Sequence, residues 1–442
     1  MTNRRFILPN RHFGFRAFKN YVRNYLAVSK RECNFARRKN NFMKLKYKLL
    51  FLVLLIGISA SAQKNHKSFK IESSTKIEQL KYNLGKDFGG RYSKSMSCYW
   101  NDTLYLCMID YDCFENLTLF MYDVKTASYS CCNIDMKPIC RSFRGNPYMI
   151  EHFATNGKDL VLCDVNDDEC LWMFKKQGDT FVFDCKIPDP DYLFGKSMRF
   201  LPNGKLLGLK NYAYSRDNNP TKLSLLDMES KSVTKTINVD FPLIGFTFMS
   251  PYENLSVSDS SIMLSQRGEY KISEYDFDLN KKGDLTTTPE GWKQMPTNLS
   301  DSLMNSNPHL ANKCAAFMNA SEDYSQIQYI SADENTLMVF YKQRTKDEYL
   351  YYDVWNRENG SWKLQYKNIC DKTNSLRHLS ERSLFYFQAN YTHLYIIGER
   401  MLRVRMDIPD LGRHIKSVYM NKLQEHLLNN DLSFVVDVLK FD

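Results

Sequence analysis

The segment that decides the fold begins Arg199-Phe-Leu-Pro-Asn-Gly-Lys-Leu-Leu-Gly-Leu209 and continues to Val239. Its short apolar runs cover residues 198–201, 206–209, 222–227 and 232–239. A Pro-Asn-Gly turn, a loop rich in Asn and Asp, and a Glu-Ser-Lys turn separate these runs. Apolar runs bounded by turn residues are typical of strands, so the segment predicts an antiparallel meander of four strands.

The same pattern recurs along the chain. Its first marker is a polar turn followed by an apolar strand, with equivalent positions at Leu104, Leu160, Leu206, Ile262, Leu337 and Leu394. Its second marker is an apolar strand that ends in an acidic turn, at Asp123, Asp227, Asp276, Asp353 and Asp407. The second unit departs from this marker, because Lys175 stands where the acid is expected. Six such units predict an all-β chain folded as a six-bladed β-propeller of four-stranded antiparallel blades.

The longest interval between units predicts an insertion with short helices at about 289–323, between blades four and five. Residues 416–429 carry leucines at helical spacing and predict a further helix. A propeller avoids an open edge by completing one blade with strands from both ends of the chain. Residues 68–72 and 432–441 are the predicted partners in that blade.

The first 62 residues predict a leader, and residues 63–442 a single propeller domain. Met43-Lys-Leu-Lys-Tyr-Lys48 is positively charged, an apolar run covers 49–58, and Ala60-Ser-Ala62 has small residues at the cleavage positions. These features are typical of a secretory signal peptide over 43–62, cleaved before Gln63. The alternative is an uncleaved anchor, but the apolar run is about half of the roughly 20 residues that span a bilayer. Residues 1–42 indicate a start codon placed too early or, alternatively, a long positive segment.

The net positive charge is confined to that leader. Residues 1–62 hold 14 Lys and Arg and one acid, Glu32, whereas the remainder holds 46 basic and 49 acidic residues. A body without surplus positive charge is not expected to bind nucleic acid. After cleavage no membrane span is expected, so the predicted location is the periplasm or the medium outside the cell.

The cysteines suit an exported protein. Twelve are present, and nine of the eleven that follow the leader lie between Cys98 and Cys185. An oxidising compartment permits disulfides, and an odd count leaves one thiol over. The candidates for disulfides flank two hairpin loops: Cys107 with Cys113, and Cys163 with Cys170.

With this repeat number, spacing and leader, the chain resembles the TolB-like six-bladed propellers of exported bacterial proteins. The resemblance covers residues 68–442. It implies a non-enzymatic role in binding or assembly. No repeated Trp-Asp, kelch or sialidase motif is present.

The predicted binding surface is the face that carries the loops between the second and third strands of each blade. These loops are acidic or aromatic in the first three blades and basic in the fifth. Tyrosines there can stack on a sugar or pack against a protein. The candidate residues are Tyr111, Tyr212, Tyr214, Arg216, Asp217, Lys342 and Arg344. The plain alternative is that these loops are polar because they are solvated.

No motif predicts a catalytic residue, a cofactor or a metal site. The acidic stretch Asp164-Val-Asn-Asp-Asp168 begins like a calcium loop but lacks the glycine and the bidentate glutamate that such a loop requires. The sequence therefore predicts an exported binding propeller whose partner is a protein or a glycan. The alternatives are a propeller hydrolase acting on extracellular carbohydrate through two carboxylates, and a structural subunit of an envelope assembly.

Overall fold

The computed structural model describes sixteen stretches of the chain. They are residues 69–77, 94–109, 116–140, 150–164, 170–195, 197–210, 221–239, 255–265, 268–296, 299, 320–321, 323–344, 350–370, 393–397, 400–406 and 434–441. All belong to a compact unit that covers Lys67–Asp442, whereas Met1–His66 form a separate unit.

The described strands form six four-stranded antiparallel meanders. The first comprises β2 (Lys94–Trp100), β3 (Thr103–Ile109), β4 (Asn116–Asp123) and β5 (Ser128–Asp135), followed by the short α3 (Lys137–Cys140). The second comprises β6 (Ile150–Thr155), β7 (Asp159–Asp164), β8 (Cys170–Gln177) and β9 (Thr180–Pro188). The third comprises β10 (Ser197–Phe200), β11 (Leu206–Lys210), β12 (Thr221–Asp227) and β13 (Ser232–Val239).

The second half of the chain repeats this order. The fourth meander comprises β14 (Leu255–Val257), β15 (Ile262–Ser265), β16 (Lys271–Tyr275) and β17 (Lys281–Thr286). The fifth comprises β18 (Gln326–Ala332), β19 (Thr336–Lys342), β20 (Tyr351–Glu358) and β21 (Ser361–Cys370). The sixth comprises β22 (His393–Ile397), β23 (Arg400–Met406), β24 (Phe434–Phe441) and, at its outer edge, β1 (Phe69–Ile77).

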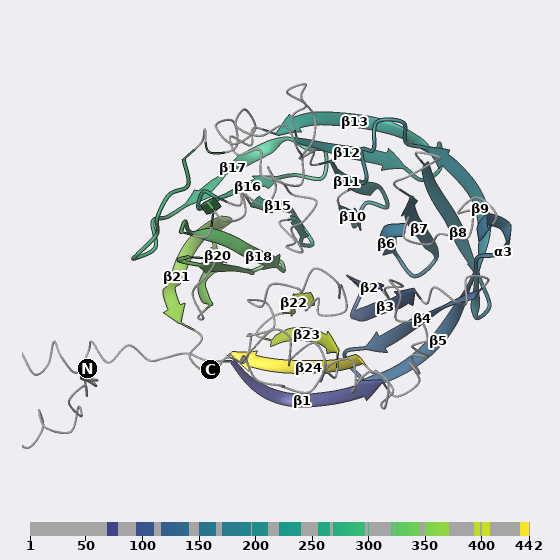
Figure 1. Cartoon of the computed structure of the whole chain (residues 1–442), viewed down its shortest axis with the longest axis horizontal. Coiled ribbons are helices and arrows are strands. Elements are labelled where there is room, and N and C mark those ends of the chain that lie inside the picture. Colours follow the sequence, from purple (N-terminus) through teal and green to yellow (C-terminus); the bar gives the residue numbers. More distant parts are fainter. Residues whose placement is uncertain are drawn as a thin grey trace, which may run out of the picture. The chain divides into compact units, whose positions relative to one another are not determined.

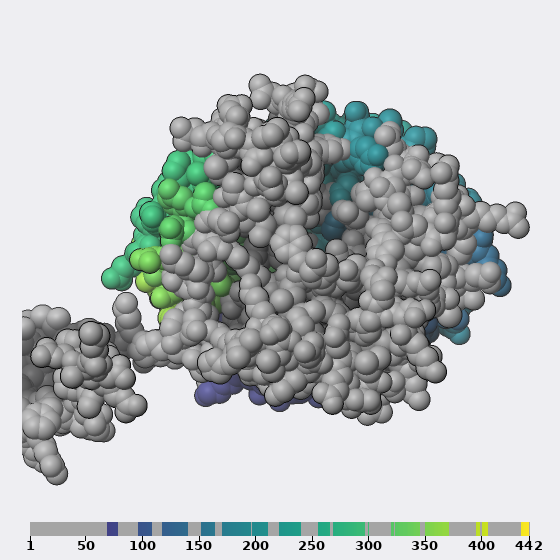
Figure 2. All heavy atoms as spheres, viewed as in Figure 1, coloured from purple at the N-terminus to yellow at the C-terminus, as the bar shows by residue number. Residues whose placement is uncertain are grey.

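The six blades surround a common axis and close into a ring (Figure 1). Six clusters of buried apolar residues hold them together, and each cluster lies between two consecutive blades, including the sixth and the first. Figure 2 shows the rim of this ring, with β1 in purple at the lower edge and the outer strands of the third blade in teal at the upper edge. The prediction of a six-bladed β-propeller is therefore confirmed.

The predicted ring closure is also confirmed. β1 pairs with β24 in antiparallel register from Phe69↔Phe441 to Ile77↔Phe434. Within this blade Asp437 is fully buried and accepts hydrogen bonds from Arg403 Nε at 2.8 Å and Ser74 Oγ at 2.6 Å. Arg403 Nη2 lies 2.6 Å from the same carboxylate. The buried Asp437 carboxylate thus joins three strands, two of which, β1 and β24, come from opposite ends of the chain.

Two repeat markers differ from the prediction, one in its strand and the other in its place along the strand. Leu394 lies in β22, the first strand of the sixth blade, and not in its second strand. Asp353 lies inside β20 and is fully buried, whereas the turn of the fifth blade is formed by Asn359 and Gly360. Burial raises the pKa of Asp353, and the hydroxyl groups of Tyr270 and Tyr341 donate to its carboxylate at 2.7 and 3.2 Å. It therefore serves the core and not a turn.

The second blade departs from the others at its outer edge. β9 pairs in parallel with β5 of the first blade, at Asn133↔Thr180 and Ile134↔Phe181, so the two blades form one sheet of eight strands.

The insertion predicted at 289–323 falls between β17 and β18, but its helices and the helix at 416–429 lie largely or wholly outside the described residues. Within the described stretches, none of the helices has the length and hydrophobicity needed to cross a bilayer.

We expect Asp437→Ala to destabilise the protein strongly, because it leaves the buried Arg403 guanidinium without a counter-charge. Loss of one partner of a buried ion pair costs about 3–5 kcal/mol. The matched control is Glu72→Ala, which removes the exposed pair between Glu72 and Arg400 and should cost less than about 1 kcal/mol. Urea unfolding of both variants measures the difference. Equal losses of unfolding free energy would contradict a closing role for Asp437.

Candidate functional site

A cavity of about 590 Å³ lies where the inner strands of all six blades converge. Figure 1 shows β2, β6, β10, β18 and β22 nearest the centre of the ring. The lining comprises residues 98–102, 154–155, 199–200, 202, 255–259, 329, 331–335 and 395–397. These are the ends of the first strands and the turns that lead to the second strands. We call this cavity the axial pocket.

Side chains in the wall of the axial pocket also link neighbouring blades. Ser256 Oγ accepts the backbone N–H of Ala332 at 2.9 Å, and Ser331 Oγ accepts that of Ile396 at 3.0 Å. The Cys98 thiol hydrogen-bonds the backbone of Thr155 in the second blade. The wall is therefore ordered by bonds between adjacent inner strands, which keeps the pocket preformed.

Arg199 is the only basic residue that lines the pocket in the described part of the chain. It comes from the third blade and hydrogen-bonds the hydroxyl of Tyr395, which comes from the sixth, opposite blade. Its Nη1 also donates to the Met198 carbonyl at 2.7 Å. Tyr395 Oη lies 2.7 Å from Ser97 Oγ, and burial raises the pKa of Tyr395 to about 12 despite the nearby guanidinium. The phenol is thus neutral and serves as a hydrogen-bonding partner.

Four carboxylates surround the mouth of the pocket: Asp102, Asp259, Asp333 and Glu334. Lys125 Nζ lies 2.5 Å from Asp102, and the Asp333 carboxylate accepts the backbone N–H groups of its own turn at 2.9 and 2.7 Å. The side chains of Asp259 and Glu334 are exposed. The mouth therefore carries net negative charge.

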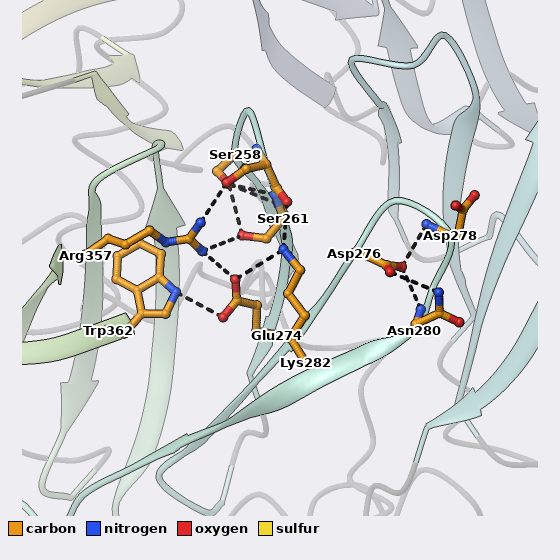
Figure 3. Close-up of polar contacts among 10 residues, drawn as sticks. Ser258, Ser261, Glu274, Asp276, Asp278, Asn280, Lys282, Arg357 and Trp362 are labelled. Carbon is orange, nitrogen blue, oxygen red and sulfur yellow. Dashed lines mark hydrogen bonds and ion pairs between the residues drawn. The ribbon is translucent and has the colours of Figure 1, made fainter. Parts of the chain in front are cut away.

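A polar cluster between the fourth and fifth blades supports this mouth (Figure 3). Arg357 of β20 reaches the turn at 258–261 and forms an ion pair with Glu274 of β16. Trp362 Nε1 donates to the same glutamate at 3.1 Å. The turn held in this way carries two residues of the pocket wall, Ser258 and Asp259.

Most of the predicted binding residues lie outside the described part of the chain: Tyr111, Tyr212, Tyr214, Arg216 and Asp217. Lys342 and Arg344 are described. Lys342 is buried at the end of β19, and Arg344 follows it and is exposed. β19 starts at the pocket mouth and ends at Lys342. The predicted loop face and the axial pocket therefore lie at opposite ends of the strands.

The register does not suit a bridge between Cys163 and Cys170. Cys163 is opposite Leu171, and Cys170 is opposite Asp164. Cys163 packs into the core shared with the third blade, whereas Cys170 packs into the core shared with the first. The two side chains thus leave opposite faces of one sheet, which is incompatible with disulfide geometry. Cys107 is described and buried, but Cys113 lies outside the described residues.

The axial pocket was not predicted. Its signal was present in the polar turns at Asn101, Asp259 and Glu334, which served only as repeat markers. Convergence of six distant turns on one axis cannot be derived from their spacing alone. Within the described stretches, no three His, Cys, Asp or Glu side chains lie close enough to hold one metal ion.

Neither a protein-family model nor a curated protein sequence matches the chain. Its structural neighbours are six-bladed β-propellers. A member of the DUF4221 family from Bacteroides vulgatus is 9% identical, with a TM-score of 0.43, over 86% of this chain and 99% of that one. A luciferin-regenerating enzyme is 12% identical, with a TM-score of 0.38, over 83% and 96%. The calcium-binding protein regucalcin from Agrobacterium tumefaciens is 9% identical, with a TM-score of 0.35, over 78% and 90%. At such low identity these proteins do not bear on what this chain binds.

We expect the Cys98 thiol in the pocket wall to resist alkylation. Cys98 is 2% exposed, and burial raises its pKa to about 12. At pH 8 the reactive thiolate is then on the order of one molecule in ten thousand. Iodoacetamide labelling followed by peptide mass spectrometry should find Cys98 unmodified in the native protein and modified after unfolding in urea. Labelling at equal rates in both states would contradict this placement.

Proposed function

We propose that the protein is an exported binding protein that holds a hydroxyl-rich ligand, the end of a glycan, in the axial pocket. The observation that carries the proposal is the convergence of all six blades on one cavity of about 590 Å³. Cavities of roughly 300–1,000 Å³ that combine apolar walls with a few convergent polar groups are typical of ligand sites. The expected ligand is uncharged or cationic, because the mouth carries four carboxylates.

The side chains of the pocket match the chemistry of a sugar. Carboxylates and serine hydroxyls accept hydrogen bonds from ligand hydroxyl groups, and a guanidinium donates to ligand oxygens. The aromatic members of the lining are Tyr99, Trp100, Phe200, Tyr329 and Tyr395. Aromatic side chains bury the apolar face of such a ligand while keeping a polar edge.

The four carboxylates at the pocket mouth suit ligand binding better than they suit catalysis of glycoside hydrolysis. A glycosidase places two carboxyl groups on either side of the scissile bond, and one of them has a raised pKa. Asp102 is bound by Lys125, and Asp333 is bound by its own turn. Asp259 and Glu334 are exposed, whereas the general acid of a glycosidase lies in an apolar pocket.

The proposal is tested by titrating the protein with glucose, N-acetylglucosamine, glucosamine and glucuronic acid, using ligand-observed NMR and calorimetry. We expect the neutral or amino sugars to bind and glucuronic acid to bind at least tenfold more weakly, because its carboxylate approaches an acidic mouth. Paired substitution of Asp259→Asn and Glu334→Gln should weaken binding of the best sugar at least tenfold. A tenfold change corresponds to about 1.4 kcal/mol.

The matched control is Glu229→Gln, which alters an exposed acid in the outer turn of the third blade and should leave affinity unchanged. No binding of any of these sugars at millimolar concentration would contradict the proposal. Hydrolysis of the corresponding glycosides, abolished by Glu334→Gln, would instead establish an enzyme.

The cellular setting is part of the same proposal. The leader at 43–62 supports export to the periplasm or beyond, and the repeat count supports a place among TolB-like propellers. The partner would then be a glycan of the cell envelope or of the surroundings. The loop-face residues remain predicted contacts for a protein partner.

N-terminal sequencing of the exported protein tests the leader. We expect the mature chain to begin at Gln63, because small residues occupy the two cleavage-determining positions, Ala60 and Ala62. Ala62→Leu should block processing, whereas Ser61→Leu, between those positions, should not. An exported protein that retains Met43 would show that the segment is not a cleaved signal peptide.

A further inference from the structure

Arg357 connects two adjacent turns of the pocket mouth. Its backbone N–H donates to the Asn335 carbonyl at 2.8 Å, and this turn of the fifth blade carries Glu334. Its side chain crosses to the turn of the fourth blade, where Nη1 donates to Ser260 Oγ at 2.8 Å and Nη2 to Ser261 Oγ at 3.2 Å. That second turn carries Asp259. Arg357 thus contacts both the turn that carries Glu334 and the turn that carries Asp259.

The guanidinium is held in one place from two further directions (Figure 3). It pairs with Glu274, and it lies over the ring of Trp362 at 4.6 Å from the ring centre. Lys282 Nζ donates to the Ser260 carbonyl at 3.1 Å and lies 3.8 Å from the same glutamate. The side chains of Arg357 and Glu274 are only 15% and 11% exposed, so solvent screens this ion pair much less than a pair on the surface.

The propeller scaffold does not itself require this side chain. In the first blade the backbone N–H of Val124 donates to the Asp102 carbonyl at 2.9 Å, and in the second that of Lys176 donates to the Lys158 carbonyl at 2.8 Å. These bonds are the counterparts of the bond from Arg357 to Asn335. The scaffold bond therefore forms with valine or lysine at this position. The guanidinium adds a link to the neighbouring turn.

Arginine suits this link for a geometric reason. Its planar fork directs two nitrogens at once, and here they reach two serine hydroxyls and a carboxylate. A lysine ammonium in the same place would retain the charge without the fork. We propose that Arg357 is a positioning residue of the axial pocket, which fixes the turn bearing Asp259 relative to the turn bearing Glu334.

The first test needs no ligand. Hydrogen exchange of backbone amides is compared in the native protein, Arg357→Met and Arg357→Lys, with Arg400→Met as the control for loss of an exposed arginine. Arg357→Met should speed exchange at Ser260 and Ser261 at least tenfold and leave the amides of β15 unchanged. Unchanged exchange at both serines, or equal acceleration throughout the fourth and fifth blades, would overturn the proposal.

The two substitutions separate fork geometry from charge. If the fork matters, Arg357→Lys should show faster exchange at Ser260 and Ser261 than the native protein, although its charge is unchanged. Full restoration of native exchange by lysine would show that charge alone suffices and would overturn the assignment of the fork. The control Arg400→Met should match the native protein at both serines.

The second test rests on the proposed binding function. The sugar that binds best among glucose, N-acetylglucosamine and glucosamine is titrated against the same variants. Arg357→Met should raise its dissociation constant at least fivefold, and Arg400→Met should not. If the sugar binds the native protein and Arg357→Met equally well, the positioning role is wrong while the binding function stands. If none of the sugars binds the native protein, the binding function fails and hydrogen exchange still decides the role of Arg357.

Discussion

The pairing of β1 with β24 is the constraint on which the rest of the structure depends. A blade of a propeller has apolar side chains on both faces, so it needs a neighbour on each side to bury them. The six buried clusters supply those neighbours only when the sixth blade meets both the fifth and the first. The bond between Ser74 and Asp437 spans 363 positions in the sequence. The axial pocket exists because this long-range pairing closes the ring.

The same polar groups that stabilise the ring also shape the pocket. Ser256 and Ser331 satisfy backbone N–H groups of the next blade, which would otherwise be buried without a partner. The Tyr395 hydroxyl, bound to Ser97 and Arg199, joins blades on opposite sides of the axis. The contacts that join the blades are therefore also the contacts that order the pocket wall.

Local patterns in the sequence predicted the scaffold closely but did not reveal the axial pocket. The four strands of the third blade lie within one residue of their predicted bounds, because alternating apolar runs and turn residues determine a meander locally. The sixth blade was misaligned by one strand, since β24 is far from β23 in sequence and the acid taken as its marker, Asp407, follows β23 in the sequence. Asp353 was placed in a turn because sequence does not distinguish an acidic turn from a buried acid bonded by tyrosines. The pocket depends on six turns meeting in space, and no local pattern encodes that.

The ring is regular in backbone but not in the side chains that it turns toward its axis. The second and third blades contribute Ala154, Thr155, Arg199, Phe200 and Pro202 to the pocket, whereas the mouth carboxylates come from the first, fourth and fifth blades. The carboxylate acceptors are therefore on one side of the pocket, and the Arg199 guanidinium, a donor, is on the other. Such a division would favour one orientation of an asymmetric molecule, because its hydrogen-bond donors and acceptors are matched only in that orientation. Arg357 lies on the acceptor side, where a small shift of one turn would change the spacing of the hydrogen-bond acceptors.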